Sequence, residues 1–193
     1  RAYSVCGAVA LLVIGTCGLA SEGRAENEAL LQASRAASKE FGAALKEQLM
    51  AGMKAGGPLT AIDVCHTAAG DIAAEMSRKH GVSLRRTALR VRNEANAPDA
   101  FEREALERFV QAIADGQDAA TLEHSEIVST ESGKVFRYMK AIPTAAEPCL
   151  ACHGSSIQPE VQARLIELYP NDTATGFKAG ELRGAFSVSV SVP

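Results

Sequence analysis

One segment of this 193-residue chain, Cys149-Leu150-Ala151-Cys152-His153, has a spacing with a specific chemical meaning. Two thiols three positions apart can each form a thioether with one vinyl group of a porphyrin. The histidine that follows can then bind the iron as its proximal ligand. The C-x-x-C-H spacing therefore predicts one covalently attached haem c. A disulfide, half of a zinc site and a thioredoxin-type redox pair are the alternatives.

The surroundings of the motif favour haem over these alternatives. A zinc site would need a second pair of ligands with its own short spacing. The remaining cysteines are Cys6, Cys17 and Cys65. A thioredoxin-type pair begins a helix after a strand, whereas here Pro148 precedes the motif and Gly154 follows it. Such neighbours indicate a loop or one short helical turn.

The start of the chain indicates export, which haem c attachment requires. Residues 2–20 carry no charge, and small residues occupy Gly18-Leu19-Ala20 and Gly23-Arg24-Ala25, as signal peptidase needs. We therefore expect residues 1–25 to be a signal peptide, or an N-terminal membrane anchor because the apolar run is close to spanning length. Residues 26–193 should then form one domain in the periplasm or another extracytoplasmic space. Any membrane contact would be made only through an uncleaved N-terminal segment.

The composition suits one globular domain. The chain is 47% hydrophobic and 22% charged, with a net charge of −3. Nothing in this balance predicts binding to nucleic acid or to an anionic membrane surface. If Cys149 and Cys152 hold haem, Cys65 is the one thiol left over in the exported domain.

Hydrophobic periodicity predicts an α+β domain. Helices are expected at residues 26–55, 59–80, 99–115 and 159–168. Strands are expected at residues 82–91, 126–130, 134–142 and 182–192. Gly56-Gly57-Pro58 separates the first two helices, and Asp99-x-x-Glu102 resembles a capping box at the start of the third. The haem motif comes late and is flanked by strands, which favours an antiparallel sheet over an all-helical cytochrome.

The second axial ligand of the iron is open on the residues alone. Cys65 lies on the apolar stripe of its helix, which fits either a ligand or a buried free cysteine. His66 is one position, about 100°, further round the same helix, so both residues cannot face one iron squarely. The further candidates are His80, His124 and the four methionines.

Several segments resemble, in order, a known family. They are Ala61-Ile62-Asp63-Val64-Cys65, Leu84-Arg85-Arg86-Thr87-Ala88-Leu89-Arg90-Val91-Arg92-Asn93, Cys149-Leu150-Ala151-Cys152-His153-Gly154, Tyr169-Pro170-Asn171-Asp172 and Gly180-Glu181-Leu182-Arg183-Gly184-Ala185-Phe186-Ser187-Val188. Together they resemble the exported, PAS-like c-type haem proteins, which occur as lone domains and as sensor modules. The resemblance covers residues 27–193. It implies a PAS-like antiparallel sheet with a long N-terminal helix, and iron coordination by His153 and a distal Cys65. His66, next to Cys65, is the alternative distal ligand.

Haem would also need partners for its two propionates. Arginine is the residue that pairs best with carboxylates. The candidates are Arg85, Arg86, Arg90, Arg92 and Arg183. A solvated basic strand face is the alternative interpretation of these residues.

We expect a redox or small-gas sensor, with a periplasmic electron-transfer cytochrome as the alternative. A diatomic gas or a redox partner protein would be the respective partner. We do not expect an enzyme, because a peroxidase-like catalyst needs an open distal position with acid or base groups beside it. The long helix that starts at Glu26 could pair with its copy in a homodimer.

Overall fold

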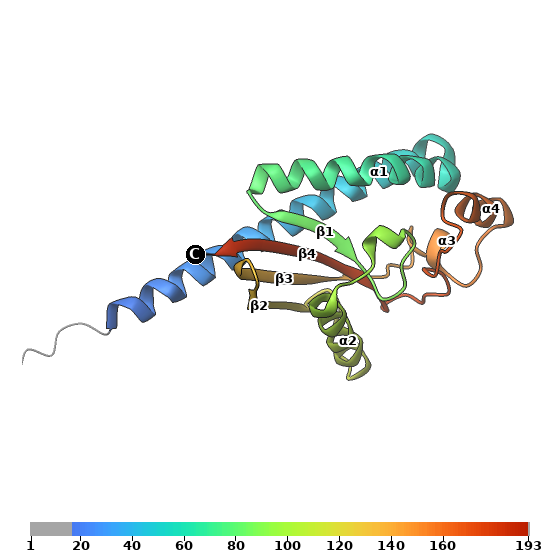
Figure 1. The fold of residues 1–193 in the computed structure, drawn as a ribbon. Coiled ribbons are helices and arrows are strands. Elements are labelled where there is room, and N and C mark those ends of the chain that lie inside the picture. The colour runs from blue at the N-terminus through green and yellow to red at the C-terminus, as the bar shows by residue number, and fades with distance from the viewer. Residues whose placement is uncertain (1–16, 193) are drawn as a thin grey trace, which may run out of the picture.

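The computed structural model describes residues 17–192, so most of the expected signal peptide or anchor lies outside the described residues. The chain forms helices and strands in mixed order around one antiparallel sheet (Figure 1). The elements are α1 (Cys17–His80), β1 (Ser83–Thr87), a 3₁₀ turn (Glu94–Asn96), α2 (Ala100–Ala114), β2 (Glu123–Thr130), β3 (Gly133–Pro143), α3 (Leu150–His153), α4 (Pro159–Leu168) and β4 (Leu182–Val192). The predicted α+β class is confirmed, and its PAS-like character remains a prediction.

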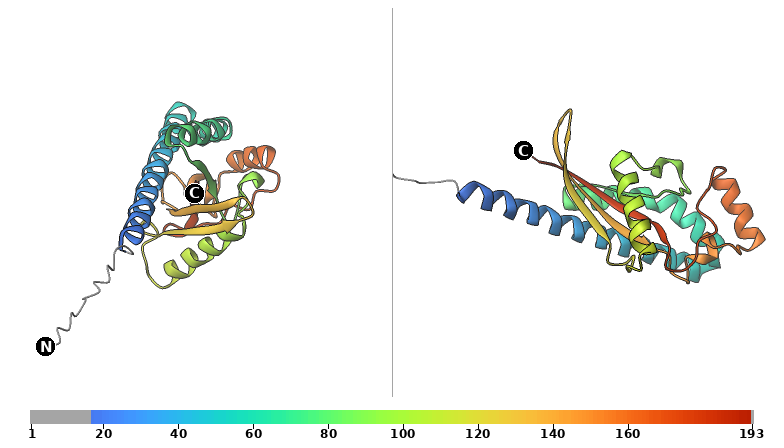
Figure 2. Two further views of the ribbon diagram at one scale, coloured as in Figure 1. Left: turned by 60° about the vertical axis from the view of Figure 1, so that its left-hand side comes forward. Right: turned by 90° about the horizontal axis from the view of Figure 1, so that it is seen from below.

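Helix α1 folds back on itself as two arms. The bend lies at Gly56 and Gly57, where the backbone leaves helical geometry and Gly57 takes φ +71°, a left-handed value that favours glycine. The arms approach so closely that a Cβ at Gly52 would lie 2.7 Å from the Ala61 Cα atom. The first arm begins at Cys17 rather than at the predicted Glu26, and its start projects beyond the sheet with residues 23–29 all exposed (Figure 2).

The sheet has the strand order β1-β4-β3-β2, and every neighbouring pair is antiparallel. Strand β4 is therefore interior although it is the last strand in the chain. The alternation that predicted β4 places Val188 against the core, opposite Tyr138 of β3. Strand β1 ends at Thr87, earlier than the predicted Val91, because the chain leaves the sheet there.

Helices pack on both faces of the sheet. Both arms of α1 cover one face, where Phe41 and Met76 contact Tyr138 and Val188 in one buried cluster. Helix α2 covers part of the opposite face through Leu106 and Phe109, which pack against residues of β3 and β4. Its start is the predicted capping box. The Asp99 carboxylate accepts a hydrogen bond from the Glu102 backbone N–H, and the Glu102 carboxylate accepts one from the Asp99 backbone N–H.

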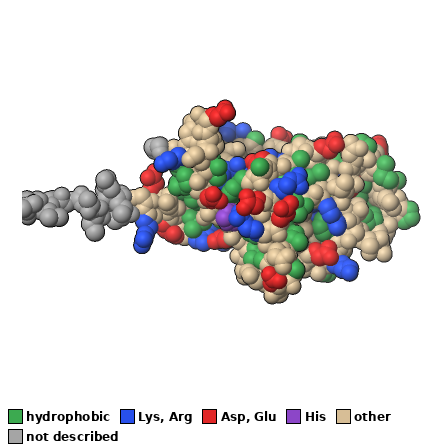
Figure 3. All heavy atoms as spheres, turned by 60° about the horizontal axis from the view of Figure 1, so that its bottom comes forward, with side chains coloured by type: hydrophobic (Ala, Val, Ile, Leu, Met, Phe, Trp, Pro, Cys, Tyr) green, Lys and Arg blue, Asp and Glu red, His purple; other side chains and the backbone are tan. Residues whose placement is uncertain are grey.

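The remaining helices, α3 and α4, lie beyond one end of the sheet, beside the bend of α1 (Figure 1). Val161 and Leu165 of α4 pack on Ile62 of the second arm in a third apolar cluster. Acidic and basic side chains are interspersed on the face drawn in Figure 3, in keeping with the small net charge. Within residues 17–192, no helix is both long enough and apolar enough to cross a membrane.

Candidate functional site

The C-x-x-C-H motif forms the single helical turn α3 at the end of the sheet, as its neighbours predicted. Cys149 precedes the turn, and its carbonyl oxygen accepts from the His153 N–H at 2.9 Å. Both thiols of the motif are free and half-buried. A second loop follows α4 and holds the turn: the Gly176 and Phe177 N–H groups donate to the Gly154 and His153 carbonyl oxygens, each at 2.9 Å.

One ring nitrogen of His153 carries no proton and can donate an electron pair. Its Nδ1 lies 2.7 Å from the Ala174 carbonyl oxygen, which can only accept, so Nδ1 carries the proton. Nε2 is therefore the nitrogen with an available lone pair, and in this structure it accepts from Arg183 Nε at 3.3 Å. Burial, and then the charges of Arg183 and Arg92, lower the pKa of His153 to about 2. The imidazole is consequently neutral, the form that binds metals.

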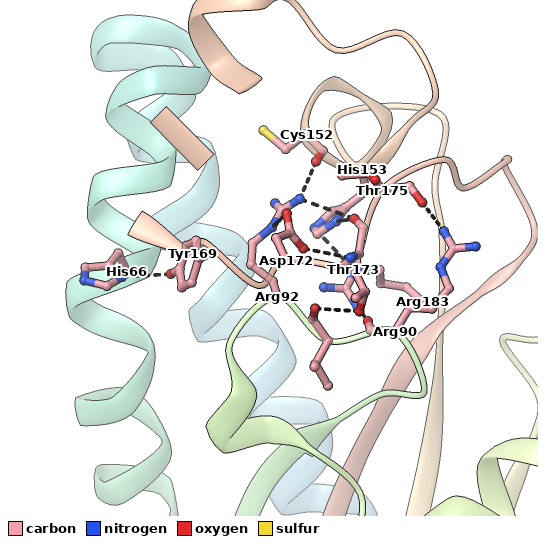
Figure 4. A network of polar contacts seen from close by, with 12 residues as sticks. His66, Arg90, Arg92, Cys152, His153, Tyr169, Asp172, Thr173, Thr175 and Arg183 are labelled. Carbon is pink, nitrogen blue, oxygen red and sulfur yellow. Dashed lines mark hydrogen bonds and ion pairs between the residues drawn. The ribbon is translucent and has the colours of Figure 1, made fainter. Parts of the chain in front are cut away.

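Arg92 ties the two loops of the site together. Its Nε donates to Asp172 at 2.9 Å, and its Nη2 donates to the Cys152 carbonyl oxygen at 2.6 Å (Figure 4). The same Nη2 also reaches the Ala174 carbonyl oxygen at 3.3 Å. Asp172 in turn accepts from the Ala174 N–H at 2.7 Å, which fixes the carbonyl that orients His153. The ion pair thus sets the position of both the thiol loop and the imidazole.

Positive charge exceeds negative charge around this site. We call Arg86, Arg90, Arg92 and Arg183 the arginine cluster. Among the described residues, Asp172 is the only carboxylate that forms an ion pair with any of them. Burial, then the neighbouring Arg92 and Arg86, lower the pKa of Arg183 to about 10, and burial also lowers the pKa of Arg86. A buried cation without an anionic partner is costly, so the cluster is suited to an anionic ligand.

Aromatic and backbone contacts hold two members of the cluster. The Arg90 guanidinium carbon lies 3.7 Å from the centre of the Phe177 ring, and that of Arg183 lies 5.5 Å from it. Arg90 also donates to the Thr175 carbonyl oxygen, while its Nε has no partner. Arg183 donates weakly to the Arg90 carbonyl oxygen at 3.4 Å. None of these acceptors carries a full negative charge.

The structure does not bring the fifth predicted arginine to the site. Arg85 alternates with Arg86 along β1 and points the other way. Its guanidinium donates to the Ala95 and Ala97 carbonyl oxygens and lies 3.6 Å from Glu102 at the start of α2. Arg85 therefore lies outside the candidate site.

Cys65 reaches the site from the second arm of α1. Cys152 packs on the apolar cluster that contains Ile62, which lies one helical turn before Cys65 on the same face. Burial raises the pKa of the Cys65 thiol, while the nearby Arg86 opposes that rise. Burial also raises the pKa of the Cys152 thiol, and among the smaller effects is the charge of Cys65. Cys65 and Cys152 are therefore close enough for the charge of one thiol to affect the pKa of the other.

His66 lies apart from the buried part of the site. Its ring is exposed, its Nδ1 lies 2.9 Å from the Tyr169 hydroxyl, and the two rings meet edge to face at 5.2 Å. His66 and Tyr169 line a shallow surface hollow of about 170 Å³ together with Arg92 and Asn171. Of the two distal candidates, Cys65 is the one that faces inward.

Comparison with known proteins assigns the family. A family model described as Tll0287-like matches residues 19–191. The chain belongs to the Tll0287-like family. One solved structure, described as the cyanobacterial haem protein Tll0287, is similar to this chain at 29% identity with a TM-score of 0.53. The match covers 67% of this chain and 73% of that one. A comparison with curated protein sequences gives no match.

This Tll0287-like chain also contains site residues to which the sequence assigned no role. Asp172 accepts a hydrogen bond from Arg92, and the Ala174 carbonyl oxygen orients His153. The Phe177 ring packs against the Arg90 guanidinium. The segment that contains Asp172 was visible as part of the resemblance, whereas a backbone carbonyl such as that of Ala174 has no signature in side-chain types. Within the part of the chain that the structure describes, no three His, Cys, Asp or Glu side chains gather as a metal site made by protein alone.

Proposed function

We propose that this chain is an exported c-type haem protein that acts as a redox or small-gas sensor. Cys149 and Cys152 would hold the porphyrin through thioethers, and His153 and Cys65 would bind its iron. The observation that carries the proposal is the pairing of a neutral imidazole, oriented through Ala174, with buried cations that lack carboxylates. The similarity to a haem protein supports the same conclusion.

The residues present fit a haem. The donor set is two adjacent thiols and an imidazole whose Nε2 has its lone pair available. Two propionates would supply the negative charge that Arg86, Arg90 and Arg183 lack. Arg183 would have to give up its hydrogen bond to Nε2, which at 3.3 Å is long and therefore weak. Haem iron, when bound, exchanges single electrons and takes up diatomic gases.

The position of Cys65 supports sensing rather than electron transfer alone. Cys65 is carried by the second arm of α1, and the first arm of the same helix projects beyond the domain. Release of Cys65 on reduction or gas binding would remove one contact of this arm, which Met76 and Ile62 also hold through apolar packing. A helix that changes position when one contact breaks is a two-state element of the kind sensors use.

Covalent attachment is tested by expressing the full chain in a host that matures c-type cytochromes. Denatured protein should keep the added mass of one haem, and replacement of Cys149 and Cys152 together by serine should abolish this mass. A colourless chain of unmodified mass would refute the proposal.

The distal ligand is tested by electron paramagnetic resonance and resonance Raman spectra of the ferric protein. Cys65→Ala should replace the low-spin thiolate spectrum, whereas the matched variant His66→Ala should leave it unchanged. An unchanged spectrum in Cys65→Ala would remove Cys65 from the iron.

Sensing and electron transfer are distinguished by the midpoint potential and by gas binding. A thiolate donor stabilises ferric iron, so we expect a potential well below that of His/Met cytochromes. CO or NO should bind the ferrous protein with loss of the Cys65 contact. A high potential, rapid electron exchange with a cytochrome and no gas binding would instead identify a periplasmic electron-transfer cytochrome.

A further inference from the structure

Strand β2 leaves one edge of the sheet open. It is the outermost strand on the side away from β1 (Figure 1), and no other strand of the described residues pairs with its far side. The opposite edge is covered, because the second arm of α1 runs beside β1 and the Ser77 hydroxyl accepts a hydrogen bond from the Leu84 N–H. An open strand edge presents unpaired backbone groups to which another strand can bind.

The register of the sheet fixes which backbone groups of β2 point outward. The Ala141 N–H donates to the Leu122 carbonyl oxygen at 3.1 Å, so these opposite residues form a hydrogen-bonded pair. Hydrogen-bonded pairs alternate along an antiparallel ladder, so every second residue counted from Leu122 bonds to β3. The residues whose N–H and C=O groups instead point along the open edge include Ser125, Ile127 and Ser129.

Strand β2 lacks the features that usually prevent pairing at an edge. Natural sheets protect such edges with lysine, proline or a bulge. Residues 123–130 contain neither lysine nor proline, and their register with β3 is continuous over the whole strand. Ile127 is 40% exposed on this strand although it is a large apolar residue. The edge is therefore both open and partly apolar.

A groove borders the open edge on the face that α1 covers. Its volume is about 400 Å³, and its apolar lining comes from Leu31, Ile127 and Phe136. Arg24 and Glu28, one turn apart near the start of α1, also line it. A partner that fits this groove must therefore bring apolar area and charges of both signs.

We propose that two copies of this chain form a dimer in which β2 pairs antiparallel with β2 of the second copy. A two-fold axis at Ile127 places the two Ile127 side chains opposite each other, beside the groove of each copy. It also sets Ser125 opposite Ser129 of the second copy, where small side chains permit close approach. The strands involved lie after position 122, so the pairing is independent of haem and of where the export segment ends.

Charge favours this register and this partner. An axis at Glu126 would place Glu126 directly opposite its copy, and like charges in that position are destabilising. With the axis at Ile127, Glu126 lies opposite Val128 of the second copy. The first arms of α1 then run in opposite directions, so Arg24 of one copy approaches Glu28 of the other. The second copy thus supplies the apolar area and both charges that suit the groove.

Sedimentation equilibrium of the full chain over a concentration series tests the dimer. We expect a mass twice that of one chain at the higher concentrations, with or without haem. Ile127→Lys puts a charge on the axis, and Ser129→Pro removes an outward N–H while leaving the bonds to β3 in place. Both variants should have the mass of one chain. The matched control is Ile166→Lys, the same substitution at an exposed isoleucine of α4, which should remain a dimer.

Two results would overturn the proposal. One is a parent chain that stays monomeric at every concentration. The other is a dimer that persists in both β2 variants, because the contact would then lie elsewhere, as in a pairing of the long helices. Circular dichroism shows whether each variant is folded.

Hydrogen exchange of the unmodified chain provides a readout that needs no variant. The amides of Ser125, Ile127 and Ser129 have no strand partner within their own chain, so they should exchange slowly only when the dimer forms. Rapid exchange of these amides at concentrations where sedimentation shows a dimer would exclude pairing through β2.

Discussion

Replacing Arg183 with methionine should stabilise the haem-free protein, the reverse of what removal of a well-paired buried residue does. Burial and two neighbouring arginines lower the pKa of Arg183 to about 10. Arginine ordinarily has a pKa of about 12.5, and a change of one in pKa is worth about 1.4 kcal/mol. Keeping Arg183 charged in the folded state therefore costs on the order of 3 kcal/mol.

The lost contacts reduce the net gain. Arg183 makes long hydrogen bonds to His153 Nε2 and to the Arg90 carbonyl oxygen, at 3.3 and 3.4 Å, and lies near the Phe177 ring. Each such contact is worth about 0.5–1 kcal/mol. Methionine keeps an unbranched apolar stem in the space. We expect a net stabilisation of about 1 kcal/mol, which raises the urea midpoint by roughly 0.5 M.

The matched control is Arg92→Met, the same substitution at a paired arginine. Arg92 donates to Asp172 at 2.9 Å, and both side chains are largely buried. Its removal leaves a buried carboxylate unpaired and should cost about 2–3 kcal/mol. Urea unfolding of the haem-free variants at pH 7, followed by circular dichroism, checks both signs. If both substitutions lower the urea midpoint, the conclusion that Arg183 lacks an anionic partner is wrong. In haem-loaded protein the gain at Arg183 should disappear, because a propionate would then pair with it.

Three further predictions concern stability and use the same unfolding assay. Asp99→Ala removes the N-cap of α2 and should cost about 1–2 kcal/mol; no change in the urea midpoint would mean that the capping box contributes nothing. The Arg35 hydrogen bond lowers the pKa of Glu123, so this carboxylate stabilises the fold above its unfolded pKa and loses that effect as the pH falls through its lower folded value. Glu123→Gln should therefore remove part of the destabilisation seen as the pH falls below about 4.5, and parallel pH profiles would contradict this. Gly57→Ala should cost about 1 kcal/mol because φ is +71° there, whereas Gly70→Ala, inside the helix with open space around it, should be neutral or stabilising.

The elements with strong local signals were predictable from the sequence. The valine–serine alternation gave β4 its predicted bounds, and Pro159 marked the start of α4. The capping box at Asp99 and the bend at Gly56 and Gly57 were also correct, because each depends on a few neighbouring residues. The early start of α1 was missed, since an apolar run can be read as an export segment or as a helix.

The spatial assembly of the site could not be predicted in the same way. The pleat of β1 separates Arg85 from Arg86, and a loop rather than a strand carries Arg92, but no local pattern distinguishes these arginines. The approach of Cys65 to the motif depends on how α1 folds back at its bend. Those positions follow from long-range packing, which a single sequence expresses only through resemblance to a family.

The interior position of β4 determines when this fold can form. Strands β1 and β3 have no hydrogen-bonded contact with each other, and both pair with β4. The sheet is therefore incomplete until β4 is available, and before that a nascent chain can pair only β2 with β3 among these strands. Arg183, which lies against His153 in the folded protein, belongs to this same late strand. The contact between Arg183 and the motif histidine therefore forms only when this final strand inserts.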